Sequence, residues 1–317
     1  MRAFPTTTVT SLELSLLIAG PTCLVLAASS AAFAIVRRPG WLRRAAASSA
    51  VLLLPPGLYA TGMRYRSPPA PTARPLAPGL DYERHVVGDG AVLHMVRIDL
   101  ARPDLSVVAT PPAEGTAVPA RTVRAFAEDE GAEVAINTAF FRPFHSKSPF
   151  DYYPKAGEPT EPFGFTMTDG VEFGANRYHR GTVYFTPDEA SLTPNSDVRW
   201  AVSGRTVLVR DGEVRATNDV AVAPRSAIGF DGERVLFVVV DGRQPGYSDG
   251  ITLVGLADAL VALGAQWAVE MDGGGSSTLV DATGDPVRTL NCPIHTRLPC
   301  RERPVAAQVG IKRVAAP

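Results

Sequence analysis

The sequence predicts an α+β fold, a mixed α/β domain in which helices pack on a sheet, behind an N-terminal transmembrane hairpin. Three observations support this prediction. Short runs rich in β-branched residues, bounded by Gly, Asp and Pro, recur from residue 81 onward and are typical of strands. A strand–helix–strand pattern occupies residues 234–271. Two apolar segments precede residue 64.

The composition fits a globular protein and argues against one class of partner. The chain has 317 residues, 45% of them hydrophobic, which is enough for a sizeable core in one or two domains. Its formal net charge of −1 and its pI near 6.5 leave no basic footprint for nucleic acid. We therefore expect no nucleic-acid partner.

Two apolar segments, at about residues 12–36 and 45–63, predict a membrane anchor over residues 1–66. Residues 15–36 carry no charge and exceed the roughly 20 apolar residues that a bilayer-spanning helix needs. The second segment is weaker because Pro-Pro-Gly interrupts it. Four arginines lie between the segments, and the positive-inside tendency places them in the cytoplasm. Two spans would put the large domain outside the cytoplasm, which we favour, whereas a single span would leave it inside.

A Pro-rich linker, residues 67–80, separates the anchor from the predicted soluble domain, residues 81–317. Such linkers lean toward extended polyproline II and hold a domain away from its anchor. Within the domain, Cys292 and Cys300 flank a short loop and could form a disulfide. A disulfide would fit an oxidising, extracytoplasmic compartment, and two free thiols are the alternative.

The first half of the domain predicts several strands and one short helix. Strand-like runs recur up to residue 110, and His94 in one of them is expected to face solvent or to make a core hydrogen bond. Residues 122–130 have the composition of a short helix, which Gly131 would end.

A polar residue follows the next predicted strand directly. Residues 133–136 are predicted to form a buried strand that leads into Asn137. An amide offers both donors and acceptors, which suits sugar hydroxyls or phosphate oxygens, although Asn137 could instead satisfy a turn. The long loop at residues 142–162 comes next, and loops of this length are often functional lids or binding edges.

The second half contains a strand, a helix and a second strand at residues 234–240, 253–263 and 267–271. The first strand is apolar throughout, which predicts that both of its faces are buried. Thr252 is placed to cap the helix. This order predicts a parallel crossover in the centre of the sheet. Ligands in such sheets gather at the carboxyl ends of the strands.

Each of these strands ends in an aspartate followed by glycine. Asp241 precedes Gly242 and Arg243, and Asp272 precedes Gly273, Gly274, Gly275 and Ser276. Consecutive glycines let a ligand approach the backbone closely. The alternative is that either segment is simply a tight turn.

Four motifs in this order resemble the phosphodiester glycosidase family. They are AIN…FF at residues 135–141, PRSAIG at 224–229, DGR…GIT at 241–252 and MDGGGSST at 271–278. The family includes the lysosomal "uncovering enzyme", an N-acetylglucosamine-1-phosphodiester α-N-acetylglucosaminidase, and bacterial exopolysaccharide-related proteins. The resemblance spans roughly residues 81–317 and implies a mixed α/β domain built on a curved sheet.

One departure from the family concerns Asn137-Thr138-Ala139, where the family usually shows Asn-Gly-Gly. Side chains stand where glycine would let substrate or backbone come close, which implies a different substrate shape. The resemblance also implies a glycan or glycosyl-phosphate substrate. An outward-facing membrane-anchored member would meet cell-envelope or exopolysaccharide glycans.

The resemblance implies hydrolysis of a sugar 1-phosphodiester at the anomeric C–O bond, with release of a phosphate monoester. Because the second pKa of such a monoester is about 6, it departs as an anion without much protonation. Such a site needs cations that bind the phosphate more than it needs the general acid that protonates the leaving group in an ordinary glycosidase.

The motifs would supply these parts. Arg225 and Arg243 would grip phosphate oxygens, and Asn137 would bind phosphate or sugar hydroxyls. Asp272 and Asp241 would activate water or stabilise transition-state charge. Backbone N–H groups and one hydroxyl would form an anion nest at Gly273, Gly274, Gly275 and Ser276.

Two other functions stay open at this point. The domain could be a non-catalytic glycan-binding module of the cell envelope, with activity lost through the change at residues 138–139. It could also be a metal-dependent phosphodiesterase that cuts the P–O bond. No cofactor is required by the sequence, but Asp272 and Asp241 are oxygen donors that would suit a divalent cation. A Walker-type nucleotide site is excluded because no lysine follows the glycines.

Overall fold

The computed structural model describes residues 66–174, 181–217 and 220–315, together with residues 25, 26, 28, 29 and 48. The described residues from Pro68 onward, apart from Pro245–Tyr247, belong to one compact unit. The predicted transmembrane segments, residues 12–36 and 45–63, lie almost entirely outside the described residues and stay a prediction. Among the residues that are described, no helix is long and apolar enough to cross a bilayer.

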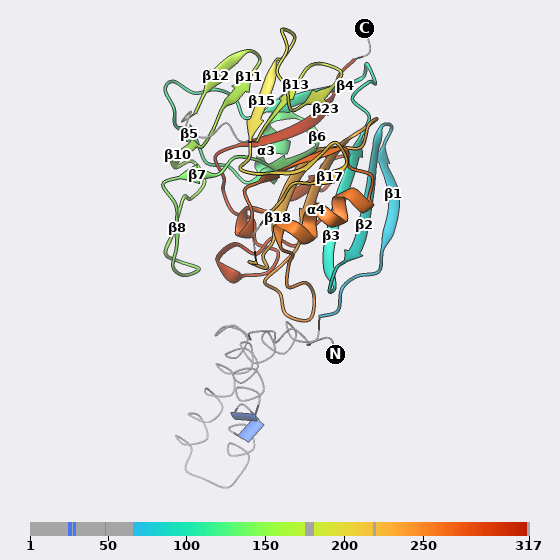
Figure 1. Ribbon diagram of the computed structural model, residues 1–317. Helices are drawn as coiled ribbons and strands as arrows, with labels where there is room; N and C mark the ends of the chain where they lie inside the picture. Colours follow the sequence, from blue (N-terminus) through green and yellow to red (C-terminus); the bar gives the residue numbers. More distant parts are fainter. Residues whose placement is uncertain are drawn as a thin grey trace. The chain divides into compact units, whose positions relative to one another are not determined.

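A sheet of eight strands forms one layer of the compact unit (Figure 1). In spatial order its strands are β1 (Thr72–Ala77), β2 (Leu80–Val87), β3 (Ala91–Ile98), β19 (Val235–Val240), β18 (Arg225–Phe230), β20 (Trp267–Met271), β16 (Val207–Arg210) and β17 (Glu213–Val214). Neighbouring strands pair antiparallel throughout.

The centre of this sheet contains the predicted crossover between strands that run in the same direction, but the two strands are not neighbours. The helix α4 (Leu253–Ala262) does connect β19 to β20, but β18 lies between them and pairs antiparallel with both. β19 and β20 therefore run in the same direction without being neighbours. β18 begins at the edge of the sheet where they end. The predicted burial of both faces of β19 is confirmed, since all six of its residues are buried.

A second sheet, of five strands, packs against the first. In spatial order its strands are β22 (Arg288–Thr289), β21 (Leu279–Asp281), β6 (Ala132–Asn137), β23 (Gln308–Arg313) and β4 (Leu105–Ala109). Another five-stranded sheet contains β12 (Val171–Phe173), β11 (Thr166–Thr168), β15 (Trp200–Ser203), β13 (Thr182–Phe185) and β14 (Ala190–Ser191). Smaller pairings join β5 (Val118–Pro119), β10 (Pro159–Pro162) and β7 (Phe141–Arg142), and also β8 (His145–Ser146) and β9 (Tyr152–Tyr153).

Apolar side chains on the facing sides of the two large sheets form the main core. Phe237 from β19 and Ile136 from β6 belong to it, and both are fully buried. On the outer face of the first sheet, α4 packs through Leu256 and its neighbours. On the outer face of the second sheet, the helix α3 (Val123–Glu130) packs through Phe126. The order of layers is thus helix, sheet, sheet, helix, with α4 (orange) and α3 (green) marked in Figure 1.

Both predicted helices form where their capping residues indicate. The side chain of Thr122 accepts a hydrogen bond from the backbone N–H of Ala125 at 3.1 Å, and Gly131 ends α3 in the left-handed conformation. The side chain of Thr252 caps α4 in the same way, from the N–H of Gly255 at 3.0 Å. The predicted ranges, 122–130 and 253–263, agree with the observed ones to within one residue at each end.

The balance of elements differs from the predicted α+β class. In the described part of the compact unit, α3 and α4 are the only α-helices, so the unit is mainly β-sheet. The physical reason is the antiparallel pairing, because antiparallel neighbours can be joined by short turns, whereas strands that run the same way need a crossover. Only the connection from β19 to β20 uses α4 in this way.

The backbone at Gly204 makes one of the closest approaches in the fold. A Cβ atom at this position would overlap the carbonyl oxygen of Glu270 in β20. We predict that Gly204→Ala lowers the free energy of unfolding by about 2–3 kcal/mol, because the strands must separate to admit the methyl group. Chemical denaturation would measure it. Gly284→Ala is the matched control, since nothing lies within 4 Å of its Cβ; an equal effect in both variants would contradict the prediction.

Candidate active site

The strand arrangement brings the predicted site residues toward one edge of the first sheet. Arg225 at the start of β18 pairs with Val240, the last residue of β19. Ser226 pairs with Met271, the last residue of β20. Asp241 and Asp272 come directly after these two strand ends, so the antiparallel β18 delivers an arginine to the edge where both aspartates lie.

Asn137 links this edge to the second sheet. Its side chain is fully buried, and its Nδ2 donates to the carbonyl oxygen of Asp272 at 2.6 Å. Its Oδ1 accepts from Oγ of Ser226 at 2.9 Å and from the N–H of Thr278 at 3.1 Å. Asn137 therefore shapes the Asp272 loop from beneath and does not line the pocket described below, which argues against the predicted contact with substrate.

Thr138 and Ala139, the departure from the family pattern, are also buried. The carbonyl oxygen of Thr138 accepts from the N–H of Asp272 at 2.7 Å. Neither side chain is among the residues that line the pocket. The change from glycine therefore alters the packing under the loop and does not narrow the pocket itself.

A pocket of about 610 Å³ opens above this loop. Residues 146–149 of the long loop predicted as a binding edge form part of its wall, and so do residues 273–275. The charged residues that line it are Lys147, Arg205, Arg225, Arg243, Glu270, Asp272, Arg297 and Arg303. Cations outnumber carboxylates in this set, so the pocket is suited to an anion.

Two of the arginines share one counter-ion, Glu270, which is 1% exposed. Arg205 donates to both carboxylate oxygens of Glu270, from Nε at 3.2 Å and from Nη2 at 3.0 Å. Arg225 donates from Nη1 at 3.2 Å, and its Nη2 donates to the carbonyl oxygen of Ala221 at 2.7 Å. Most of the hydrogen-bonding capacity of Arg225 is thus used within the protein, which makes it a weaker phosphate ligand than predicted.

Arg243 and Arg297 are different. Both side chains are exposed in the pocket, and neither guanidinium group makes a hydrogen bond or ion pair with any residue that the structure describes. The pocket walls take away part of the water around Arg243, and this burial lowers its pKa, as do the nearby charges of Arg297 and Arg225. The charge of Asp272 acts on Arg243 in the opposite direction, but neither arginine forms an ion pair with a described residue, so both guanidinium groups can bind an anion.

The backbone of both arginines is unusual as well. Arg243 has φ 57° and Arg297 has φ 63°, in the left-handed region that residues with a Cβ atom rarely adopt. Such conformations persist where the surrounding structure enforces them, and they cluster at functional sites.

The predicted anion nest of backbone N–H groups is replaced by side chains. The N–H of Gly274 donates to the carbonyl oxygen of Pro224 at 2.8 Å, and the N–H of Ser276 donates back to Gly273 at 3.3 Å. A Cβ atom on Gly274 would lie 3.1 Å from Nη1 of Arg243. The glycines thus make room for guanidinium groups and do not present a row of free N–H donors.

Asp272 lies on the pocket wall, and Ser276 holds one side of its carboxylate. Oγ of Ser276 donates to Oδ2 at 2.6 Å. Burial raises the pKa of Asp272 to about 6, although the Ser276 hydrogen bond and the charge of Arg303 act in the opposite direction. A carboxyl with such a pKa changes protonation close to neutral pH, as a general base or acid must.

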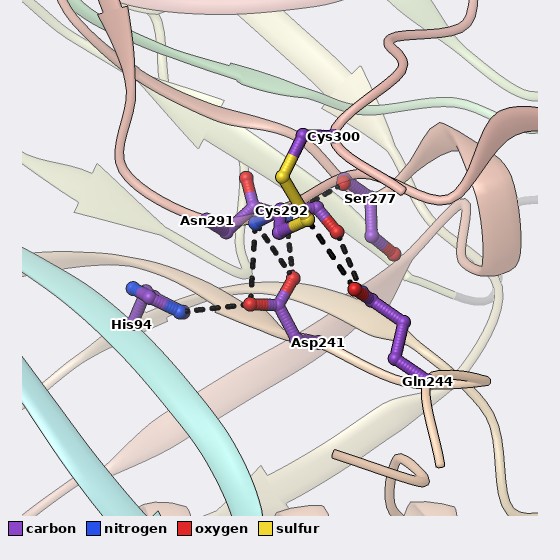
Figure 2. The surroundings of a disulfide bond; sticks show 7 residues. All are labelled: His94, Asp241, Gln244, Ser277, Asn291, Cys292 and Cys300. Carbon is purple, nitrogen blue, oxygen red and sulfur yellow. Dashed lines mark hydrogen bonds and ion pairs between the residues drawn. A yellow bond between two sulfur atoms is a disulfide. The ribbon is translucent and has the colours of Figure 1, made fainter. Parts of the chain in front are cut away.

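Asp241 has a structural role that the sequence did not indicate (Figure 2). It is 1% exposed and accepts from Nε2 of His94, from Nδ2 of Asn291 and from the N–H of Cys292, each at 3.0 Å. It does not line the pocket. The prediction of Asp241 as a catalytic group is therefore not supported, because its carboxylate is occupied by buried donors.

The same geometry bears on the predicted shared cation. Since the oxygens of Asp241 accept from nitrogen donors, they are not placed to share a metal ion with Asp272. In the described ranges, no three His, Cys, Asp or Glu side chains gather closely enough to hold a metal ion.

Cys292 and Cys300 form a disulfide that closes a short loop (Figure 2). Ile294, Thr296 and Arg297 from this loop line the pocket. The base of the loop is held by the N–H of Cys292 on Asp241 and by its carbonyl oxygen, which accepts from Nε2 of Gln244 at 2.8 Å. The disulfide and Asp241 together support the segment that carries Arg297.

Sequence reasoning identified Asp272, Arg225 and Arg243 among the pocket residues and missed three other arginines. Arg297 lies between Cys292 and Cys300, so the predicted disulfide could have indicated that this loop, and Arg297 with it, belongs to the site. Arg205 and Arg303 reach the pocket only through the tertiary fold, and no local pattern marks either of them.

The environment of Asp272 predicts a pH-dependent stability effect. Its pKa is raised on folding, so its ionisation opposes folding, and stability is lost as the pH rises through about 6. We predict that, between pH 4 and pH 7.5, the free energy of unfolding of wild type falls by about 2 kcal/mol relative to that of Asp272→Asn. This is less than the full pKa shift implies, because the side chain is partly exposed to solvent. Denaturation curves across this range would measure the difference. Asp258→Asn, at an exposed position of α4, is the matched control, and a pH-independent gap for Asp272→Asn would contradict the assignment.

The contacts of Asp241 predict a large loss of stability on substitution. In Asp241→Asn an amide NH₂ would face buried donors, which we expect to cost about 3 kcal/mol. Thermal unfolding would show the loss, with Asp258→Asn again as the control. Stability equal to that of wild type would show that Asp241 does not hold the loop.

Comparisons with known proteins identify the family of the chain. A family model described as phosphodiester glycosidase matches residues 130–312, more than half of the 317 residues, and this range contains every arginine of the pocket and Asp272. No curated protein sequence matches the chain.

Two solved structures share the fold. A hypothetical protein from Synechocystis aligns with a TM-score of 0.59 at 14% sequence identity. The alignment covers 77% of this chain and 64% of the Synechocystis protein. The zebrafish N-acetylglucosamine-1-phosphodiester alpha-N-acetylglucosaminidase catalytic domain, auto-inhibited by its pro-peptide, aligns with a TM-score of 0.53 at 17% identity, covering 79% of this chain and 86% of its own length. At such identities these structures show the fold, and the match to the family model shows the relationship: the chain belongs to the phosphodiester glycosidase family.

Proposed function

We propose that this protein hydrolyses glycosyl 1-phosphodiesters at the anomeric C–O bond and releases a free sugar and a phosphate monoester. The observation that carries the proposal is the composition of one pocket. It combines a pair of guanidinium groups, Arg243 and Arg297, without a partner among the described residues, and a carboxyl group, Asp272, whose pKa is raised to about 6. Family membership supports the same chemistry.

The two arginines would bind the phosphodiester and remain bound to the departing monoester. Guanidinium groups bind phosphate oxygens in bidentate fashion, and their positive charge stabilises the negative charge that builds up on the leaving group. Because the monoester leaves as an anion, no strong general acid is needed. The excess of cations over carboxylates in the pocket fits this requirement.

Asp272 would act as the general base. In its ionised form it would take a proton from the water that attacks the anomeric carbon, and its raised pKa makes it a better base than an ordinary carboxylate. Ser276 orients the carboxylate through the hydrogen bond to Oδ2. Glu270 contributes indirectly by holding Arg205 and Arg225 in the wall of the pocket.

We further propose that the domain is anchored in the membrane and faces outward. The apolar segments at residues 12–36 and 45–63 and the Pro-rich linker at residues 67–80 support the anchor. The disulfide between Cys292 and Cys300 supports an oxidising compartment. The substrates in that setting would be phosphodiester-linked glycans of the cell envelope or exopolysaccharides.

The pocket argues against the two alternatives from the sequence. A binding module was suggested by Thr138 and Ala139, but these residues are buried under the loop and leave the pocket unchanged. A metal-dependent phosphodiesterase was suggested by an Asp241–Asp272 pair, but Asp241 is occupied by buried nitrogen donors.

The proposal predicts the effect of removing the pocket charges. On a panel of α-glycosyl 1-phosphodiesters, we expect Arg243→Met combined with Arg297→Met to lower kcat/KM at least about 100-fold, and Asp272→Asn to lower it about 1,000-fold. Arg234→Met, which removes a half-exposed surface arginine, is the control. In heavy-oxygen water the label should enter the sugar and not the phosphate.

The outcome distinguishes the three functions. Label in the phosphate would show P–O cleavage and overturn the assigned bond. Saturable glycan binding without turnover, for every donor tested with the full-length protein, would favour the binding module.

A further inference from the structure

A chain of hydrogen bonds connects Asp272 to a histidine that does not line the pocket. Oδ2 of Asp272 accepts from Oγ of Ser276 at 2.6 Å. The same oxygen atom of Ser276 accepts from Nη1 of Arg303 at 3.0 Å. Nε of Arg303 then donates to Nδ1 of His295 at 3.2 Å. The chain runs from the candidate base in the pocket to the loop that the disulfide closes.

The direction of these bonds determines the state of His295. A guanidinium group can only donate, so Nδ1 of His295 must be an unprotonated acceptor and the ring proton must be on Nε2. The ring is 1% exposed. Burial and the charges of Arg303 and Arg301 lower its pKa to about 3, which keeps the imidazole neutral at neutral pH.

The surroundings hold this ring in place. Tyr152, from the long loop, packs against it edge to face with 4.6 Å between ring centroids. Nε2 of His295 is buried without a hydrogen-bond partner among the described residues. The protein thus keeps a histidine here at the cost of one unsatisfied N–H, and only its Nδ1 has a contact that explains its presence.

Arg303 depends on this contact for its orientation. The side chain is 8% exposed, and its guanidinium group lies over the ring of Phe144, 4.5 Å from the centroid. Its Nε and Nη1 are directed to His295 and Ser276, which together fix the plane of the group. In that position its charge acts on Asp272 and lowers the pKa of that carboxyl.

We propose that His295 is a positioning residue: its neutral Nδ1 fixes the guanidinium group of Arg303 and, through Ser276, the carboxylate of Asp272. This inference rests on the proposed function, in which Asp272 is the base. His295 touches neither substrate nor water in this scheme. It sets the orientation and the proton affinity of the group that does.

The experiment compares three substitutions that differ in where they place an acceptor. The side-chain oxygen of asparagine takes the position of Nδ1, and that of glutamine the position of Nε2, whereas phenylalanine keeps a ring without an acceptor. We expect His295→Asn to retain most of the wild-type kcat. We expect His295→Gln and His295→Phe to lower kcat about 10- to 100-fold with little change in KM.

The pH profile provides a readout that a merely structural role would not change. The charged groups facing Asp272 are Glu270 from β20, Arg225 from β18, and Arg243, Arg297 and Arg303 from the loops. When Arg303 is no longer held, its attraction for the ionised carboxylate weakens. The rising limb of kcat/KM, near pH 6 in wild type, should then move up by about 0.5–1 pH unit in His295→Phe and stay in place in His295→Asn.

A measurement independent of turnover separates this inference from the proposed function. In wild type, nitrogen NMR should show His295 protonated at Nε2 only and not titrating between pH 5 and pH 9. Carbon NMR should show the pKa of Asp272 raised further in His295→Phe and His295→Gln than in His295→Asn. These variants also provide a second test if one of them fails to fold.

The outcomes are distinct. Equal Asp272 titration in all three variants, or a His295 that titrates near neutral pH, would overturn the positioning role even in an active enzyme. NMR coupling as expected in a protein that turns over no glycosyl phosphodiester would establish the positioning role and overturn the proposed function.

Discussion

The side chain of Asn137 is the contact on which the site depends most. It is fully buried at the junction of the two large sheets, and its amide bonds the carbonyl oxygen of Asp272, the N–H of Thr278 and the hydroxyl of Ser226. These partners come from both ends of the glycine loop and from the neighbouring strand. Because one planar amide offers both donors and an acceptor, the single side chain of Asn137 bonds both ends of the loop and the neighbouring strand. The sheets supply the position of Asn137, and Asn137 supplies the shape of the loop.

The electrostatics of the pocket divide its arginines into three kinds. Arg205 and Arg225 both pair with Glu270 and act as part of the wall. Arg303 is held by hydrogen bonds to Ser276 and His295. Arg243 and Arg297 form no ion pair with any described residue. An anion that enters would relieve the repulsion that the nearby charges of Arg297 and Arg225 impose on Arg243.

How much of this could be read from the sequence depends on how local each feature is. The helices were predictable because Thr122, Thr252 and Gly131 cap them within a few residues. Asp272 and its glycines were predictable because they are consecutive. The insertion of β18 between β19 and β20 was not, since a strand–helix–strand pattern does not indicate whether the two strands are neighbours in the sheet.

The role of Asp241 was misjudged for the same reason. Its donors, His94, Asn291 and Cys292, are all distant in sequence, so an aspartate at a strand end looked like a site residue when it is a buried support. Arg303 shows the converse case. It follows no motif and is held near Asp272 by Ser276 and His295. Helix caps and turns can be predicted because their interactions join residues close in sequence. Interactions between residues distant in sequence become visible only in the folded structure.

The position of β23 has a consequence for the order in which the protein can assemble. It pairs with β6 on one side and β4 on the other, so it fills the interior of the second sheet although it is the last strand of the unit to be synthesised. Until it emerges, β6 and β4 each expose an unpaired edge, the kind of surface that other chains can join. The segment just before it carries Arg297, Cys300 and Arg303. Neither the complete second sheet nor the complete pocket can therefore form before the segment up to β23 has been synthesised.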